Sequence, residues 1–249
     1  MSGVWYWFLK WALFRPVCIV AFRPWIKGAE NIPEGGALLA GNHLSAGDTF
    51  LLPALIRRRL TFPAKAELFK GDKGVRSKVV AWFLKAVGQV PMDRSGGRAS
   101  ATGLGPVMQT LADGGLVGIF PEGTRSVDGN LYKGRTGVAR LALESGVPVL
   151  PVGFVNTEFR RGLFGIPVMH KPGVIIGKPL DFSEFAGRQD ELKVLRHVTD
   201  QVMAGVQELT GQRYVDVYST RVKFGDLKGT DLTPHVRERP GADRPLPEA

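Results

Sequence analysis

The chain of 249 residues carries 33 Lys and Arg against 23 Asp and Glu, which leaves a formal net charge of +10 at pH 7. This length can bury a sizeable core, and we expect one large domain. A basic balance favours phosphate-rich partners such as nucleic acid, anionic lipid or a nucleotide-bearing cofactor, without choosing among them. The single cysteine, Cys18, excludes an internal disulfide and fits a reducing compartment.

The first 26 residues are dense in aromatic and basic side chains. The segment contains four of the five tryptophans and three cations: Trp5, Trp7, Trp11, Trp25, Lys10, Arg15 and Arg23. Because Pro16 breaks a helix and no uncharged stretch reaches the roughly 20 residues that span a bilayer, we expect neither a simple transmembrane helix nor a secretory signal. Trp, Lys and Arg suit the headgroup region, so a helical hairpin around Pro16 is expected at the anionic membrane surface, on the cytoplasmic face. The alternative is a hairpin packed on the protein's own core.

From residue 27 to residue 218, apolar runs alternate with amphipathic ones. The expected strands cover residues 37–40, 60–64, 88–92, 116–120, 147–155 and 174–176. The expected helices cover residues 48–58, 75–86, 98–112 and 137–145, with a long closing helix over 184–209. This alternation predicts a single α/β domain with a mostly parallel or mixed central sheet flanked by helices. Residues 219–249 are charged and rich in proline, which predicts a mobile tail.

The segment from Asn42 to Asp48 follows the first of these strands and offers a base beside a carboxylate. In open α/β sheets, ligands bind and catalytic residues lie at the carboxyl ends of the strands. A loop that contains Gly47 can fold the Asp48 carboxylate back onto the imidazole of His43. An aspartate on one ring nitrogen fixes the tautomer and leaves the other nitrogen to take a proton. The alternative is that His43 only hydrogen-bonds its loop and Asp48 only caps a helix.

The segment from Phe120 to Ser126 follows another predicted strand and offers a cation. Arg125 supplies a planar fork suited to bidentate contacts with phosphate. Glu122 could orient that arginine or bind a substrate hydroxyl. The alternative is an ordinary surface turn in which Arg125 pairs with Glu122.

Four blocks in this order resemble the glycerolipid acyltransferases, with the nearest likeness to bacterial 1-acylglycerol-3-phosphate O-acyltransferases. The blocks are residues 42–48, 88–94, 120–125 and 147–153, and the resemblance covers roughly residues 27–180. Four ordered blocks are far more specific than any one of them. Lys65-Ala66-Glu67-Leu68 is similar to the family's Lys-x-Glu-Leu element, and the aromatic N-terminal segment is similar to a membrane-seated two-helix element of the family. The tail over residues 219–249 matches no part of the family, so the pattern and the resemblance together predict three regions: membrane-associated helices over residues 1–26, the acyltransferase domain over 27–218 and the tail over 219–249.

The resemblance implies direct acyl transfer from a thioester, either acyl-CoA or acyl carrier protein, to the free hydroxyl of 1-acylglycerol 3-phosphate, giving phosphatidic acid. In this hypothesis His43 takes the hydroxyl proton and Asp48 orients His43. No cofactor and no covalent acyl-enzyme are expected, because Cys18 lies in the membrane segment and no Gly-x-Ser-x-Gly elbow occurs. Ser45 is interpreted as a loop hydroxyl.

The resemblance also implies the residues of the acceptor site. Phosphate would be held by Lys65, Arg125 and Arg94, and the glycerol pocket would be shaped by Glu122, Gly123 and Thr124. Arg94 and its neighbour Asp93 could equally form an ordinary ion pair at a strand end. The apolar block 147–153 is explained by packing as a buried strand.

Several other chemistries lack support in the sequence. The four histidines lie far apart and there is one cysteine, so no metal site is expected. No complete nucleotide-binding motif occurs, and no nucleic-acid partner is expected. The remaining alternatives are a non-catalytic protein that binds anionic membranes, a phospholipid-directed hydrolase, and an acyltransferase for glycerol 3-phosphate or another lysophospholipid.

Overall fold

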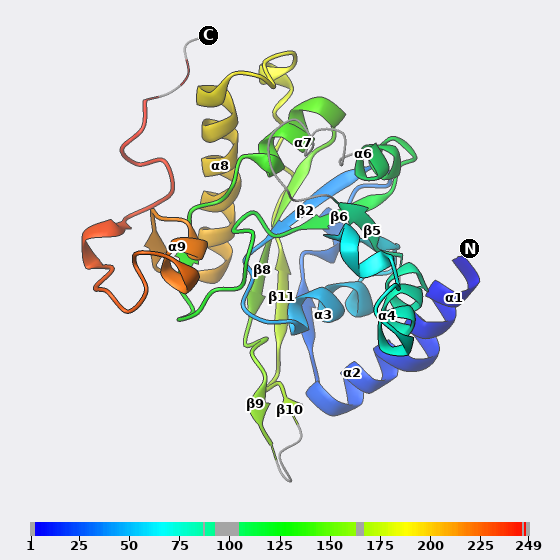
Figure 1. Cartoon of the computed structure of the whole chain (residues 1–249). Helices are drawn as coiled ribbons and strands as arrows, with labels where there is room; N and C mark the ends of the chain where they lie inside the picture. Colours follow the sequence, from blue (N-terminus) through cyan, green and yellow to red (C-terminus); the bar gives the residue numbers. More distant parts are fainter. Residues whose placement is uncertain (1–2, 87, 93–104, 163–166, 246, 248–249) are drawn as a thin grey trace.

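A six-stranded sheet forms the centre of the protein, seen in a computed structural model that describes residues 3–86, 88–92, 105–162, 167–245 and 247 (Figure 1). In spatial order its strands are β1 (Trp25–Lys27), β11 (Gly173–Ile176), β8 (Val149–Val155), β2 (Ala37–Gly41), β6 (Leu116–Ile119) and β3 (Leu60–Thr61). Every neighbouring pair is parallel except β8 and β11. The predicted mostly parallel or mixed sheet is confirmed.

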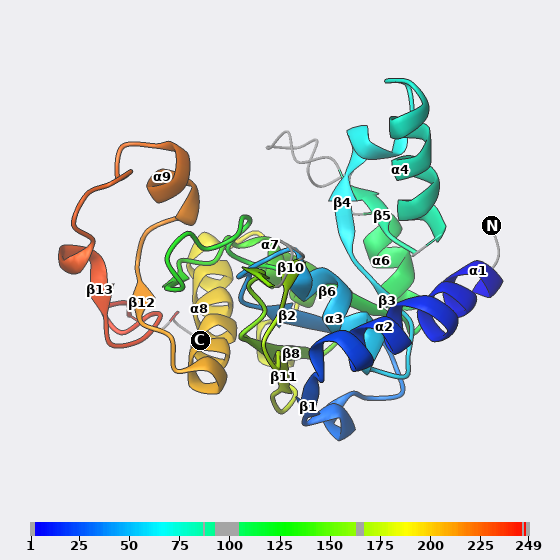
Figure 2. The ribbon, with the colours of Figure 1, turned by 90° about the horizontal axis from the view of Figure 1, so that it is seen from below.

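Strand β2 lies between β6 and β8, and its side chains divide the core into two layers. Leu38 and Ala40 belong to an apolar cluster on one face, whereas Ala37 and Leu39 belong to a cluster on the other. This division follows from the two-residue period of a strand. Helices α6 (Gly105–Ala112), α7 (Gly137–Ser145) and α8 (Leu192–Thr210) cover the first face, and α3 (Gly47–Leu55) covers the second (Figure 2). The segments that follow β2 and β6 therefore leave two neighbouring strands of the sheet.

Local signals gave the bounds of two helices, whereas one predicted strand is divided in the structure. Helix α4 (Val75–Ala86) and helix α7 have the predicted bounds. The predicted strand 60–64 is divided, because Pro63 offers no backbone N–H to a continuing ladder. Its second half is β4 (Pro63–Lys65), which pairs in parallel with β5 (Val90–Met92) outside the main sheet. Residues 98–104 of the expected third helix lie outside the described residues.

The N-terminal segment is one continuous helix, so the predicted hairpin is wrong. It runs through α1 (Gly3–Phe8), a π-helical stretch (Leu9–Phe14) and α2 (Arg15–Phe22). Pro16 lies in the first turn of α2, where a missing N–H is tolerated at the change from π to α bonding. By length and composition, Val4–Phe22 could cross a membrane, with a mean hydropathy of 1.2. This finding concerns length and composition alone, and the expectation of no simple transmembrane helix stays a prediction.

The residues after 218 are packed against the domain, in contrast to the predicted mobile tail. They form α9 (Ser219–Phe224) and β13 (Val236–Arg237), which pairs with β12 (Tyr214–Val215). Apolar residues scattered among the charged ones fill a small core: Val222, Leu227, Leu232 and Val236, packed against Tyr132, Val215 and Val217. Arg244 adds ion pairs with Asp200 and Asp216. The sequence analysis predicted a mobile tail from the many charged residues and prolines, and it did not consider the spacing of the few apolar residues.

Two further small ladders complete the described structure. Strand β7 (Leu131–Tyr132) pairs in parallel with β12, so the three-stranded sheet β13-β12-β7 joins the C-terminal segment to the chain that follows β6. Strands β9 (Arg160–Arg161) and β10 (Pro167–Val168) form an antiparallel pair. The closing helix α8 begins at Leu192 rather than at residue 184, because residues Ser183–Phe185 form a separate 3-10 turn.

Candidate active site

The imidazole of His43 and the carboxylate of Asp48 meet at the C-terminal end of β2, as the sequence predicts. Nδ1 of His43 lies 2.8 Å from Oδ2 of Asp48. The same oxygen accepts the backbone N–H groups of Leu44 at 2.7 Å and Ser45 at 2.9 Å. Asp48 is fully buried in the first turn of α3, where the helix dipole stabilises a negative charge. The carboxylate therefore holds the loop and the ring together.

The loop between His43 and Asp48 is braced by Ser45. Its hydroxyl donates to the carbonyl of Thr157 and accepts the backbone N–H of Gly47 at 2.8 Å. A Cβ at position 47 would lie 2.8 Å from both the carbonyl oxygen of Thr157 and the sulfur of Met169, so only glycine fits. These contacts agree with the interpretation of Ser45 as a loop hydroxyl.

Asn42 fastens the end of β2 to β8, a role that the sequence analysis missed. Its side-chain oxygen accepts the N–H of Phe154 at 2.7 Å, and its amide donates to the carbonyl of Phe154 at 3.1 Å. The same amide nitrogen donates to Oε1 of Gln212 at 2.8 Å. The side chain imitates one further backbone pair of the sheet, which fixes the direction in which His43 leaves the strand.

The ring of His43 is packed against an aromatic stack. It lies over Phe120 with a centroid separation of 3.9 Å and an interplanar angle of 12°, and Phe120 stacks on Phe62 at 5.4 Å. The His43 side chain remains 17% exposed. Because Nδ1 is committed to Asp48, Nε2 is the nitrogen left to accept a proton. The sequence analysis treated Phe120 only as a strand residue, and nothing in its local pattern signalled this contact.

Glu122 connects the two motifs, but not in the way the sequence suggested. Its two carboxylate oxygens accept the backbone N–H groups of His43 at 2.9 Å and Tyr132 at 3.0 Å. The side chain is 1% exposed, and this burial raises the pKa of Glu122 to about 8. The backbone N–H of Ser126 donates to the carbonyl of His43 at 2.7 Å. The carboxylate of Glu122 therefore contacts two backbone N–H groups rather than Arg125, and its contact with substrate stays a prediction.

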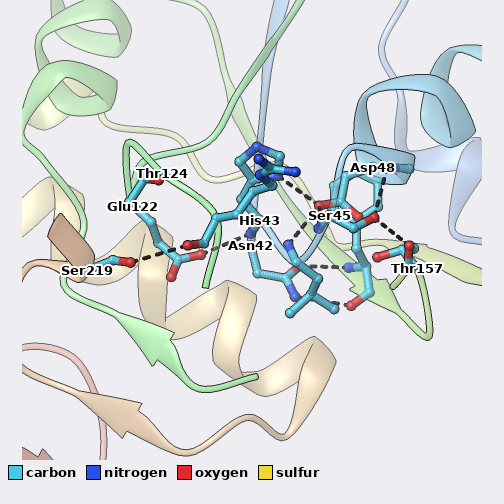
Figure 3. Close-up of polar contacts among 12 residues, drawn as sticks. Asn42, His43, Ser45, Asp48, Glu122, Thr124, Thr157 and Ser219 are labelled. Atoms are coloured by element: carbon cyan, nitrogen blue, oxygen red, sulfur yellow. Dashed lines mark hydrogen bonds and ion pairs between the residues drawn. The ribbon is translucent and has the colours of Figure 1, made fainter. Parts of the chain in front are cut away.

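Figure 3 shows two groups of residues around His43. On one side are Ser45, Asp48 and Thr157, and on the other are Glu122, Thr124 and Ser219. The end of β2 and the turn after β6 therefore form one site.

The turn from Gly123 to Arg125 presents a cation to solvent. Gly123 has a φ of +76°, which favours glycine, and a Cβ there would lie 2.8 Å from Nε of Arg135. The Arg125 side chain is exposed, and in the described part of the chain its guanidinium pairs with no carboxylate. The alternative of an Arg125–Glu122 ion pair is not found.

The remaining residues and blocks that the sequence analysis singled out lie in β4, in β8 or outside the described residues. Lys65 lies in β4, opposite Met92 in the β4–β5 ladder. Arg94 and Asp93 lie outside the described residues. Strand β8, from the fourth block, is buried along nearly its whole length, in agreement with a packing role. Within the described residues, no group of three or more His, Cys, Asp or Glu could hold a metal ion.

Two residues of the C-terminal segment contact the turn, where the sequence analysis expected no contact. The hydroxyl of Ser219 donates to the carbonyl of Arg125 at 3.5 Å, and Nζ of Lys223 donates to Oγ1 of Thr124 at 3.3 Å. No local signal in the sequence could have found these contacts, because almost one hundred residues separate the partners.

Comparison with known proteins finds one family model and several similar proteins. A family model described as Acyltransferase matches residues 23–155. The chloroplastic 1-acyl-sn-glycerol-3-phosphate acyltransferase LPAT1 of Arabidopsis thaliana is 32% identical over 163 residues, which cover 64% of this chain and 44% of that protein. A 1-acyl-sn-glycerol-3-phosphate acyltransferase of Bacillus subtilis is 30% identical over 173 residues, covering 68% of this chain and 80% of the relative.

A solved structure is also similar. The crystal structure of the 1-acyl-sn-glycerophosphate (LPA) acyltransferase PlsC from Thermotoga maritima aligns with a TM-score of 0.55 and 28% sequence identity, over 75% of this chain and 72% of that one. The chain spans about half the length of several curated relatives, including LPAT1.

Proposed function

The chain belongs to the acyltransferase family, and we propose that it transfers a fatty acyl group from an acyl thioester to the free hydroxyl of 1-acylglycerol 3-phosphate, giving phosphatidic acid. One observation carries the proposal. The backbone of His43, whose ring is paired with buried Asp48, is hydrogen-bonded to both Glu122 and Ser126, which flank the Arg125 turn. A base and a cation suited to phosphate therefore lie at the ends of two neighbouring strands, β2 and β6. The names of the relatives indicate 1-acylglycerol 3-phosphate as the acceptor.

In the proposed reaction, Nε2 of His43 removes the proton from the acceptor hydroxyl as the oxygen attacks the thioester carbonyl carbon. The Asp48 carboxylate stabilises the imidazolium that forms, as it does in hydrolase triads. The tetrahedral intermediate then collapses, the carbon–sulfur bond breaks, and the imidazolium returns the proton to the leaving thiolate. General-base assistance of this kind is worth typically 10²- to 10⁴-fold in rate, and positioning of the two substrates supplies the rest.

The acceptor phosphate is assigned to Arg125, whose exposed guanidinium lacks an acidic partner in the described ranges. Lys65 and Arg94 remain proposed phosphate contacts. Gly123 and Thr124 shape the glycerol pocket, whereas Glu122 acts through the backbone of His43. We propose acyl-CoA or acyl carrier protein as the donor, since either is an anionic partner for a chain of charge +10, and no cofactor takes part.

We also propose that the N-terminal helix seats the protein on the cytoplasmic face of a membrane. Its outer face exposes large apolar side chains, and Trp5 contacts Trp82 of α4 at a centroid distance of 6.3 Å, which extends this face. The exposed set on the two helices is Val4, Trp5, Trp7, Phe8, Trp11, Leu13, Val17, Ile19, Val20, Val75, Val79, Val80 and Trp82. An apolar surface of this kind marks a membrane or protein contact.

The cations of this helix do not have the role expected from the sequence. Nζ of Lys10 donates to the carbonyls of Arg57 and Arg58 at 3.3 and 3.0 Å, and Arg15 donates to the carbonyl of Ala54 at 3.3 Å. These carbonyls lie at the C-terminal end of α3, where a cation is stabilised. Membrane binding therefore rests on the apolar face of the helix rather than on Lys10 and Arg15.

Incubation of the purified protein with 1-acylglycerol 3-phosphate and radiolabelled acyl-CoA or acyl carrier protein tests the reaction, with positional analysis of the product. We expect phosphatidic acid from the wild type and almost none from His43→Ala. Lipid binding without turnover in the wild type would favour a non-catalytic membrane protein. A panel with glycerol 3-phosphate and other lysophospholipids separates the alternative acceptors.

The membrane proposal has its own test. Phe8→Ser and Val20→Ser change side chains that are 57% and 80% exposed, so the fold should be retained. We expect the double variant to lose activity on vesicles but to keep wild-type activity on substrate dispersed in detergent. Unchanged activity on vesicles would contradict the proposal.

A further inference from the structure

We propose that Lys223, from the C-terminal helix α9, is a second cation of the acceptor-phosphate site. This inference rests on the proposed function and deepens it by adding a residue to the proposed substrate site. Lys223 lies outside the segment matched by the family model, residues 23–155. The C-terminal segment would thereby contribute directly to recognition of the substrate.

The first observation is the position of Lys223 on the Thr124–Arg125 turn. Its ammonium donates to Oγ1 of Thr124 at 3.3 Å and to the carbonyl of Arg125 at 3.5 Å. Both bonds are long, and an ammonium carries three donors. The described structure pairs Lys223 with no carboxylate, so its charge is uncompensated there. A ligand oxygen beside the turn would find a free donor.

The second observation is that Lys223 is one of three cations gathered around this turn. Nε of Arg135 lies 2.8 Å from the position that a Cβ on Gly123 would occupy, and Arg125 is the third cation. Neither arginine has an ion-pair partner among residues that the structure describes. Three like charges around one turn repel one another, and an anion bound between them would compensate this repulsion. A phosphate monoester, with a charge of about −1.5 to −2 at pH 7, provides that compensation.

The third observation is that α9 is fastened where it is by a set of specific contacts. Ser219 is fully buried and donates to the carbonyl of Arg125, and Arg135 donates to the hydroxyl of Thr220 at 3.1 Å. Val222 packs in the small core of the C-terminal segment. In Figure 1 the orange helix α9 lies beside the loop that follows β6. Lys223 is therefore held at the turn by the fold.

The backbone connections then place this cluster next to the proposed base. The turn is hydrogen-bonded to His43 through Glu122 on one side and Ser126 on the other. A phosphate held by Arg125 and Lys223 would therefore leave the glycerol hydroxyl within reach of the imidazole. Lys223 would select for a charged terminal phosphate and would take no part in the chemical step.

Steady-state kinetics of Lys223→Met test this assignment, because methionine keeps much of the side-chain length and removes the charge. We expect the KM for 1-acylglycerol 3-phosphate to rise on the order of tenfold, as for loss of a charge-assisted hydrogen bond. The KM for the acyl donor and kcat should stay within about twofold of the wild type. Lys223→Arg should recover most of the loss.

Lys228→Met is the matched control, since Lys228 is an exposed lysine of the same segment, and it should leave all constants unchanged. If Lys223 only fastens α9, Lys223→Met should lower the melting temperature and raise the KM values of both substrates equally. That result, or an unchanged acceptor KM, would overturn the inference.

A binding measurement separates this inference from the proposed reaction. The ³¹P NMR signal of sn-glycerol 3-phosphate can be followed on titration with His43→Ala and with His43→Ala/Lys223→Met. We expect weaker binding in the double variant even if the protein acylates another acceptor. Equal binding by the two proteins would contradict the role of Lys223, whereas a wild type without acyltransferase activity would contradict only the proposed function.

Discussion

The loop after β2 and the turn after β6 meet in one site, but they are held in different ways. Asp48 binds His43, Leu44 and Ser45, all within five residues of itself. The turn depends instead on distant partners, which are Arg135 beneath Gly123 and the C-terminal residues Ser219 and Lys223. The comparison teaches that the ring of His43 is held by a carboxylate of its own loop, whereas the turn with the proposed phosphate-binding Arg125 depends on residues elsewhere in the chain.

The largest effect is expected from the loop side. His43→Ala should lower kcat by about 10²- to 10⁴-fold, because it removes the general base. The melting temperature should change little, since the ring is partly exposed and its loop keeps Asp48. Steady-state kinetics and thermal unfolding measure the two quantities. Residual activity near the wild-type level would exclude His43 as the base.

Asp48→Ala is expected to differ from His43→Ala in its effect on stability. Because its carboxylate also accepts two backbone N–H groups, activity and stability should fall together. Each buried donor left without a partner costs about 1–3 kcal/mol. Denaturant unfolding of the two variants side by side checks this, and a fully stable Asp48→Ala protein would contradict the proposed bracing of the loop.

The next effect is on the turn side. Arg125→Ala should raise the KM for 1-acylglycerol 3-phosphate by roughly ten- to a hundredfold, since charged hydrogen bonds contribute about 1.5–3 kcal/mol. An acceptor without phosphate should lose little. Comparison of kcat/KM for the two acceptors measures the difference. Equal losses would show that Arg125 does not bind phosphate.

Two glycines of the same loop test whether the turn depends on its distant partner. Gly123 and Gly129 have φ values of +76° and +81°, so alanine at either should cost about 1–2 kcal/mol of unfolding free energy. Only at Gly123 would the added Cβ meet Arg135, whereas at Gly129 it meets open space. We therefore expect a raised acceptor KM for Gly123→Ala alone. A similar KM for the two variants would mean that Arg135 is not needed.

A further effect concerns the pH dependence of stability at the junction of the two regions. Burial raises the pKa of Glu122 to about 8, above the ordinary value of 4.5. Between these values the unfolded chain has released the proton that the folded chain still holds. Stability should therefore fall as pH rises from about 5 to about 8.

Glu122→Gln should remove this part of the slope, as denaturant unfolding at several pH values would show. The variant should also be less stable at pH 5, because an amide has one acceptor oxygen for the two N–H groups of His43 and Tyr132. An unchanged slope would contradict the raised pKa.

The sequence by itself determined the parts that depend on near neighbours in the chain. Alternating apolar runs gave the buried strand β2 and the helices α4 and α7, because side-chain period sets the face that is buried. The pairing of His43 with Asp48 was also predictable, since both lie on one short loop with Gly47 between them.

Only the tertiary structure decided the rest, because the contacts join residues far apart in the sequence. Lys10 and Arg15 of the N-terminal helix donate to carbonyls of α3 and of the loop that follows it, and Glu122 accepts the backbone N–H groups of His43 and Tyr132. The C-terminal segment packs because its few apolar residues coincide on one small core. Lys223 reaches the Thr124–Arg125 turn only through that packing, and no local pattern in the sequence indicates a contact made across almost one hundred residues.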